Sequence, residues 1–153
     1  MEQLINKAYK KANLYYYTVF VKAVLFALLG YLANKHYPNL FVFTEETKTV
    51  VSTIAYLYLV GSIPLALWMF SKKVAQLIEI EDLNIRYQKY MNWVTIRIAL
   101  IGVGFVINIV LFYMFHSSSF LYAAAIAAVA MLFCKPNKRN IDKELNPIIE
   151  IED

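Results

Sequence analysis

Apolar residues in this 153-residue chain gather into four long runs separated by short polar segments. The runs cover residues 15–33, 50–70, 93–115 and 119–134, and the spans predicted from them are about 15–34, 50–70, 93–115 and 119–135. A helix needs roughly 20 apolar residues to cross a ~30 Å hydrocarbon layer, so the first three runs are long enough and the fourth is slightly short. A short span can still reach both interfaces through tilting and snorkelling of its flanking residues. We therefore predict four transmembrane segments.

These runs are continuous and lack the alternation of apolar and polar residues found in membrane β-strands. Because backbone amides cannot stay unpaired in hydrocarbon, each run has to be helical. The chain is also too short for a second folded domain of useful size, and 60% of its residues are hydrophobic. The prediction is an all-α fold, with a single transmembrane domain over residues 1–153 built as a four-helix antiparallel bundle.

The polar segments between the runs predict the connections. Residues 116–119 are so few that the third and fourth helices are expected to form an antiparallel hairpin. Pro38-Asn39 is typical of a turn, and Thr44 is placed to cap the second helix. Residues 71–92 carry helical apolar stripes on both sides of an acidic turn around residues 79–84, so they are expected to form a hairpin outside the membrane.

Basic residues lie mainly on one side of the predicted bundle. Three precede the first run, four lie between the second and third runs, and four follow the fourth, whereas the opposite side has only Lys35 and Lys48. The eleven are Lys7, Lys10, Lys11, Lys72, Lys73, Arg86, Lys89, Lys135, Lys138, Arg139 and Lys143. The positive-inside rule then puts both termini, the hairpin 71–92 and the tail 136–153 in the cytoplasm. Since these charges lie at membrane borders and not on one folded face, the expected partner is the lipid bilayer and not nucleic acid.

Groups with reactive chemistry are few. The lone Cys134 cannot form an internal disulfide, which excludes a membrane thiol oxidoreductase and leaves either apolar packing or acylation for this residue. No phosphate loop, nucleophile elbow or paired-carboxylate motif is present. A metal site at His36 and His116 would need a convergence that their spacing does not indicate. We expect no metal, no cofactor and no enzymatic activity.

Two charged residues fall inside the runs, where an ionised group is costly and often functional. Lys22 shares a helix face with Thr18, and Arg97 shares one with Asn108. Together with Ser62 on the second helix, these residues could line a basic vestibule that opens to the cytoplasm. The alternative is that Lys22 and Arg97 snorkel to the membrane surface and the rest is ordinary packing.

Small residues predict which helix faces pack closely. The fourth run contains two pairs of alanines spaced four apart, and the third run contains two glycines, a spacing and composition that permit close helix approach. These residues are Ala123, Ala127, Ala124, Ala128, Gly102 and Gly104. Pro64 removes an amide donor within the second run and should kink that helix.

The segment from Tyr87 to Asn146 also resembles a family. With Thr95-Ile96-Arg97-Ile98-Ala99-Leu100 opening the third run and Lys135-Pro136-Asn137-Lys138 following the fourth, it is similar to small uncharacterised four-helix bacterial membrane proteins. Gly102-Val103-Gly104 stands where similar members have an acidic residue and a Gly-Pro step. The resemblance implies a four-helix fold in a bacterial inner membrane and no particular activity.

Two hypotheses about function remain open. One is a non-enzymatic membrane module that packs with itself as a homo-oligomer or with a larger membrane complex, which the small-residue faces favour. The other is a small transporter or anion pathway that uses the basic vestibule, because basic linings favour anions. No Asp or Glu falls inside any run, which disfavours a proton-coupled exporter of cations.

Overall fold

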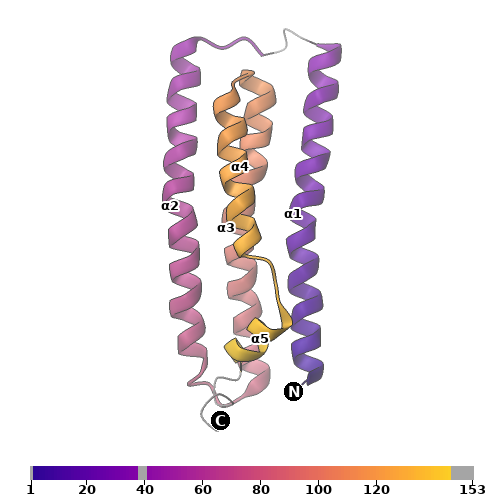
Figure 1. Ribbon diagram of the computed structural model, residues 1–153, viewed down its shortest axis with the longest axis vertical. Coiled ribbons are helices and arrows are strands. Elements are labelled where there is room, and N and C mark those ends of the chain that lie inside the picture. Colours follow the sequence, from indigo (N-terminus) through magenta and orange to yellow (C-terminus); the bar gives the residue numbers. More distant parts are fainter. Residues whose placement is uncertain (1, 38–40, 146–153) are drawn as a thin grey trace.

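The structure, a computed structural model, describes residues 2–37 and 41–145. Over these residues the chain forms five helices and no strand, which confirms the all-α class predicted from the sequence. The helices are α1 (Glu2–His36), α2 (Glu45–Leu77), α3 (Leu83–Phe115), α4 (Ser118–Phe133) and α5 (Lys138–Leu145) (Figure 1). The turn predicted at Pro38-Asn39 and the end of the predicted tail, residues 146–153, lie outside the described residues.

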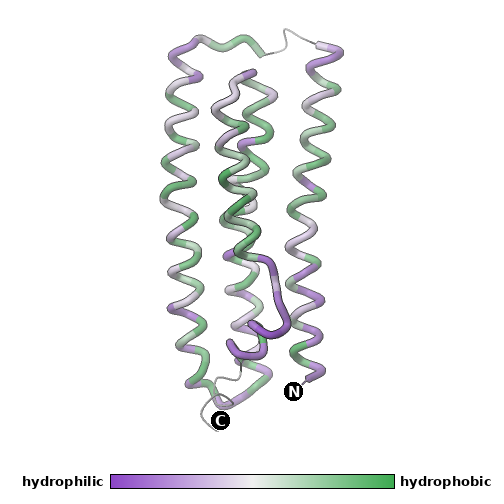
Figure 2. The backbone as a smooth tube through the Cα atoms, viewed as in Figure 1, coloured by the Kyte–Doolittle hydropathy of each residue, from purple (hydrophilic) through white to green (hydrophobic). Residues whose placement is uncertain are grey.

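The first three helices are longer than the apolar runs that predicted them. α1 has 35 residues, and α2 and α3 have 33 each, which at ~1.5 Å per residue makes each about 50 Å long. Each of the three is long and apolar enough to cross a membrane. α4 has only 16 residues and meets this test only together with α5, from which it is bent by 63°. The chain leading to α5, and most of α5 itself, is hydrophilic (Figure 2).

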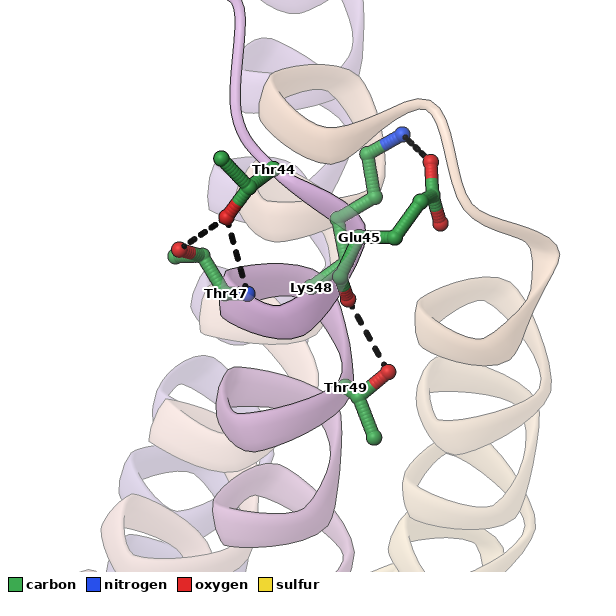
Figure 3. Close-up of polar contacts among 5 residues, drawn as sticks. All are labelled: Thr44, Glu45, Thr47, Lys48 and Thr49. Carbon is green, nitrogen blue, oxygen red and sulfur yellow. Dashed lines mark hydrogen bonds and ion pairs between the residues drawn. The ribbon is translucent and has the colours of Figure 1, made fainter.

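The start of α2 is fixed by the N-cap predicted from the sequence, which the structure confirms. The Oγ1 atom of Thr44 accepts a hydrogen bond from the backbone N–H of Thr47 at 3.3 Å (Figure 3). In the same turn, Lys48 Nζ lies 2.7 Å from Glu45 Oε1. Capping satisfies an amide that the helix itself cannot pair, so α2 begins at a defined residue.

Both ends of α3 are also defined locally. At its start, the Asp82 carboxylate accepts hydrogen bonds from the backbone N–H groups of Asn84 at 2.8 Å and Ile85 at 3.4 Å. At its end, His116 adopts a left-handed conformation with φ 51° and donates its N–H to Phe112 O at 2.9 Å. This stops the helix and turns the chain into α4 after two residues. The predicted turn before α3 and the tight α3–α4 hairpin are both confirmed.

The helices are arranged around α3, which packs against each of the other four. α1 lies beside α3 and α5, and its backbone stays more than 8 Å from the backbones of α2 and α4. Figure 1 accordingly shows α1 and α2 on opposite sides of the α3–α4 pair. Sequential neighbours therefore do not all touch: α1 packs side by side with α3, in the same direction, and not with α2. This leaves α1 as the least enclosed long helix.

The largest buried cluster lies where α5 meets the other helices. It combines side chains from all five helices, and Tyr90, Ile98, Ile101 and Met131 are almost completely inaccessible within it. Large apolar side chains elsewhere on α1 and α2 remain exposed, among them Leu14 at 67% and Val60 at 71%. Exposed apolar surface on this scale exceeds what water-soluble monomers carry and suits contact with lipid or with other membrane helices.

Candidate functional site

The five residues predicted to line a vestibule lie in three different places. Thr18 and Lys22 border a groove between α1 and α3, whereas Arg97 borders a separate cavity next to α5. Ser62 and Asn108 are buried in the helical core, with exposed fractions of 6% and 1%. Lys22 and Arg97 therefore face different spaces, although the sequence places both on inward-running polar stripes.

The groove between α1 and α3 has a volume of about 330 Å³ and is open to the side of the bundle. Its wall is mainly apolar, and among the described residues Lys22 is the one charged residue that lines it. Thr18 Oγ1 donates a hydrogen bond to Leu14 O at 2.7 Å, and Thr95 Oγ1 donates one to Met91 O at 2.9 Å. Both hydroxyls are thus satisfied within their own helices. The Lys22 ammonium is left as the groove's charged hydrogen-bond donor.

Two close contacts define the depth of Lys22 along the bundle. A Cβ added to Gly102 would lie 2.9 Å from both methyl groups of Val19, and one added to Gly30 would lie 2.5 Å from the Tyr113 ring. Residues of α1 therefore lie level with residues 83 positions later in α3. On this register Lys22 lies level with residue 105, close to the middle of the apolar run 93–115.

Lys22 is exposed on α1 and makes no hydrogen bond or ion pair with any residue that the structure describes. Its backbone is about 15 Å or more from either end of the neighbouring apolar run, at ~1.5 Å of helix rise per residue. An ionised side chain at the centre of a bilayer costs ~3 kcal/mol on insertion scales. A cation at this depth without a partner is energetically unfavourable for an isolated chain in lipid.

The small residues predicted for helix packing lie at several interfaces. Gly102 faces α1 through Val19, whereas Gly104 faces α2, where an added Cβ would lie 2.8 Å from Tyr58 Cε1 and 3.1 Å from Leu59 Cδ2. Ala123 and Ala127 are fully buried beside Leu59. Of the other two alanines of α4, Ala124 is buried and Ala128 is half-buried. These residues let the backbones of α1, α2 and α4 approach closely to their neighbours.

The remaining predicted residues lie within α2 and α3. Asn108 Nδ2 donates a hydrogen bond to Gly104 O at 2.8 Å, while Asn108 Oδ1 and Ser62 Oγ are buried and have no partner within residues 2–37 and 41–145. α2 continues as a single helix through Pro64, whose side chain is exposed. The carbonyl of Val60, four residues earlier, lacks the amide donor that Pro64 cannot supply.

Arg97 is a residue of α3. It lies beside the C-terminal end of α4, where α3 packs against α2 and α5. Its guanidinium carbon is 3.7 Å from the centre of the Phe70 ring, a cation–π geometry. Its Nε atom is buried and has no hydrogen-bond partner in the described part of the chain. The adjoining cavity has a volume of about 40 Å³ and is lined by polar groups of residues 135–144, which is enough room for a few water molecules.

Arg86 ties three chain segments together, although it is almost fully buried with 8% of its surface exposed. Its Nε donates to Ile80 O at 2.9 Å, and its Nη1 donates to Leu145 O at 2.8 Å. Its Nη2 donates to both Ile80 O and Ile78 O, at 2.5 and 3.2 Å. One guanidinium thus supplies donors to two carbonyls just beyond α2 and to the last carbonyl of α5, where the helices themselves provide no donor.

Tyr90 and Glu144 form a second polar link between α3 and α5. The Tyr90 hydroxyl donates a hydrogen bond to Glu144 Oε2 at 2.5 Å. Burial raises the pKa of the Glu144 carboxyl above its ordinary value, an effect opposed in part by the bond from Tyr90 and by the charge of Arg97. Ile141 and Leu145 are buried on the same face of α5. The helix is therefore held to the bundle by both apolar and polar contacts.

Sequence reasoning missed the roles of Arg86, Tyr90 and Glu144. Arg86 enters the sequence analysis only as one of the charges that set the orientation. The four-residue spacing of Ile141 and Leu145 is a signal that α5 docks through one face. No local signal pairs Glu144 with Tyr90, which lies 54 positions away.

The described residues contain no group of three or more His, Cys, Asp or Glu side chains arranged to hold a metal ion. Comparison of the chain with known protein families, curated proteins and solved structures finds no match. The resemblance to small bacterial four-helix membrane proteins therefore stays a prediction from the sequence. Any functional inference has to come from the geometry of the chain itself.

Proposed function

We propose that the chain is an integral membrane protein with four spans and with both termini in the cytoplasm of a bacterial inner membrane. Three spans correspond to α1, α2 and α3. The fourth corresponds to α4, whose 16 residues carry no charge and run back along α3 from the tight hairpin. An even number of spans returns the chain to its starting side, in agreement with the eleven basic residues that flank the spans there. α5 then lies outside the membrane-spanning segments, at the cytoplasmic surface.

We further propose that the protein acts as a non-enzymatic accessory module, which packs laterally with helices of a membrane complex or of another copy. The observation that supports this proposal is the position of α1, which among the described helices packs only against α3 and α5 and leaves a groove of about 330 Å³ open to the side. Membrane helices associate through small residues that allow close backbone approach, and the exposed Ala99 lines this groove. The groove can therefore accept a further helix in the plane of the membrane.

Photo-crosslinking in native membranes tests this proposal. Ile107, which is 48% exposed and lines the groove, is replaced by the photoreactive residue benzoylphenylalanine. Val129 provides a matched control, since it is 53% exposed on α4 and does not line the groove. We expect a protein adduct of one discrete mass from position 107 and only lipid adducts from position 129.

Equal adduct patterns from positions 107 and 129 would contradict a specific lateral partner at the groove. Lipid adducts alone from position 107 would contradict it as well. The mass of a protein adduct separates the two forms of the proposal: twice the chain mass of 17.7 kDa indicates a second copy, and any other mass indicates a larger complex.

The anion pathway raised by the sequence has less support from the geometry. It requires Lys22, Arg97 and Asn108 to share one space, but Lys22 borders the lateral groove while Arg97 borders the cavity beside α5. Asn108 is bound to its own helix through Gly104 O. Anion flux in proteoliposomes that disappears in Lys22→Ala would nevertheless favour a pathway over an accessory module.

A further inference from the structure

Lys22 combines three properties that call for a partner. It lies level with residue 105, near mid-depth of the apolar run 93–115. It is exposed at the groove between α1 and α3, and it makes no ion pair or hydrogen bond to the part of the chain that the structure describes. Snorkelling serves lysines near helix ends, whereas Lys22 lies about 10 Å from the nearer end of its own run 15–33 and about 15 Å from the nearer end of the run 93–115, at ~1.5 Å of helix rise per residue. A lipid phosphate is therefore poorly placed to neutralise this ammonium.

The chain cannot supply the missing anion itself. All eleven of its acidic residues lie outside the four apolar runs. A second copy has the same limitation, and a symmetric pairing of two α1–α3 grooves would bring Lys22 toward its own equivalent. Like charges at close range in a low-dielectric medium repel strongly, so self-association through this groove is disfavoured. A carboxylate that pairs with Lys22 at this depth would therefore belong to a different protein.

We infer that the α1–α3 groove receives a transmembrane helix of another protein that carries an Asp or Glu at mid-depth, and that Lys22 pairs with this carboxylate. The inference rests on the proposed accessory function and specifies the partner for it. Intramembrane charges in proteins are almost always paired with one another or turned toward the interior of an assembly. The pair would neutralise both charges and give the lateral contact a fixed depth.

The wall of the groove suits a helix. Ala99, Val103 and Val106 follow the spacing of one helix face and have short side chains, whereas Gly102 on the same face is already filled by Val19 of α1. Such a face lets an incoming helix approach α3 closely, while Lys22 reaches it from α1. Thr18 and Thr95 are occupied by bonds within their own helices, so the ammonium is the group that distinguishes a charged partner from an apolar one.

Defined peptides in vesicles test the pairing without knowledge of the natural partner. The full-length protein is reconstituted in neutral phosphatidylcholine vesicles and carries a fluorescence donor. Two synthetic transmembrane helices of Leu and Ala carry the acceptor, one with a central Asp and one with Leu at that position. We expect the Asp helix to associate about tenfold more strongly than the Leu helix, as intramembrane polar contacts of about 1–2 kcal/mol imply.

Variants of Lys22 assign this preference to the groove. Lys22→Met should abolish the preference for the Asp helix, whereas Lys11→Met, an exposed lysine on the same helix near its start, should retain it. Lys22→Asp should reverse the preference, so that a helix with a central Lys binds better than the Leu helix. This reversal cannot be produced by loss of folding, because an unfolded chain would lose all association.

Equal binding of the Asp and Leu helices by the unmodified protein would overturn the inference. A preference that survives Lys22→Met would overturn it too. If adding phosphatidylglycerol abolishes binding of the Asp helix by the unmodified protein, the ammonium is taken by lipid phosphate, and the inference also fails. These failures are distinct from failure of the proposed function, because a discrete protein adduct at position 107 would still support an accessory module whose partner lacks a mid-depth carboxylate.

Discussion

The two sides of α3 differ in how fully their charges and surfaces are covered. Toward α2 and α5, Arg86 is 8% exposed and its guanidinium donates to three backbone carbonyls. Toward α1, the Lys22 ammonium borders an open groove and has no partner within the described residues. The first side, the covered side of α3, is closed by helices of the same chain, although Ser62 Oγ, Asn108 Oδ1 and Arg97 Nε there have no partner within the described residues. The second has the features of a surface that another chain completes.

This difference follows from which helices lie next to one another. α2, α4 and α5 all pack on α3, so their side chains and helix ends can meet and satisfy one another. α1 lies next to neither α2 nor α4, so among the described helices no second long helix closes the space beside it. A buried cation needs its hydrogen bonds to be made, and Arg86 meets that condition near the end of the bundle, whereas the exposed Lys22 ammonium has no partner within the described residues.

The largest expected effect comes from Arg86, which joins α3 to the ends of α2 and α5. Arg86→Met keeps much of the length of the side chain but removes every donor to Ile78 O, Ile80 O and Leu145 O. Leaving these acceptors without a partner should lower the free energy of unfolding by about 3 kcal/mol. The loss is measured by reversible titration with sodium dodecyl sulfate in mixed micelles, followed by tryptophan fluorescence.

Lys89→Met is the matched control, because Lys89 is an exposed residue of the same helix. It should change the free energy of unfolding by less than about 0.5 kcal/mol. Arg86→Lys should recover only part of the loss, since one ammonium cannot supply the planar set of donors that spans all three carbonyls. Equal stability of Arg86→Met and Lys89→Met would show that the covered side of α3 does not depend on this guanidinium.

A pair of glycine variants compares the α1–α3 contact with an open helix surface. In Gly102→Ala the new methyl group would lie 2.9 Å from both Cγ atoms of Val19, which has a stiff branched side chain. Forcing α1 away from α3 should cost about 2 kcal/mol. In Gly61→Ala nothing lies within 4 Å of the added methyl group. The better helix propensity of Ala should then stabilise α2 by up to about 1 kcal/mol.

The two variants are therefore expected to change stability in opposite directions, measured in the same detergent titration. A stabilising Gly102→Ala would mean that α1 yields to the added methyl group without loss. The groove would then have no fixed shape to offer a partner helix, which would weaken the contrast between the two sides of α3.

Much of the fold could be predicted from the sequence, because hydrophobic run length and helix capping are local properties. The apolar runs predicted the four helices α1 to α4, and Thr44 predicted the start of α2. The tight link of residues 116–119 placed α3 and α4 side by side. The packing of α1 against α3, and not against α2, could not be predicted this way, because it depends on which of these two helices fits the surface of α1 better.

The site was harder to predict because periodicity gives a helix face but not what that face contacts. The sequence predicted that Lys22 and Arg97 both lie on inward-facing polar stripes. In the structure Lys22 borders the α1–α3 groove, whereas Arg97 borders the cavity beside α5. Arg86 was counted only as a charge that sets orientation, because its acceptors belong to helix ends up to 59 positions away. When the hydrogen-bond acceptors of a buried charged residue lie so far away in the chain, the residues next to it in the sequence do not indicate that it is buried.

The smallest expected effect concerns the polar link between α3 and α5. Burial raises the pKa of Glu144, so the docked helix holds the carboxyl proton more tightly than a released helix does. This contribution to docking is complete below the ordinary pKa of 4.5 and is lost as the pH rises through the raised value. Hydrogen exchange of the α5 amides, corrected for the intrinsic rate at each pH, should therefore show weaker protection above that range.

Glu144→Gln separates charge from hydrogen bonding at this link. The amide stays neutral at every pH and can still bond to the Tyr90 hydroxyl, so protection of α5 should become nearly independent of pH. The change in opening free energy should be about 1 kcal/mol, the size of a single hydrogen bond. Glu79→Gln, an exposed carboxyl in the turn before α3, should keep the pH dependence of the unmodified protein. If Glu144→Gln and Glu79→Gln both kept the pH dependence, another group would cause the pH response. The covered side of α3 would then be held to α5 by Arg86 and the apolar contacts of α5 alone.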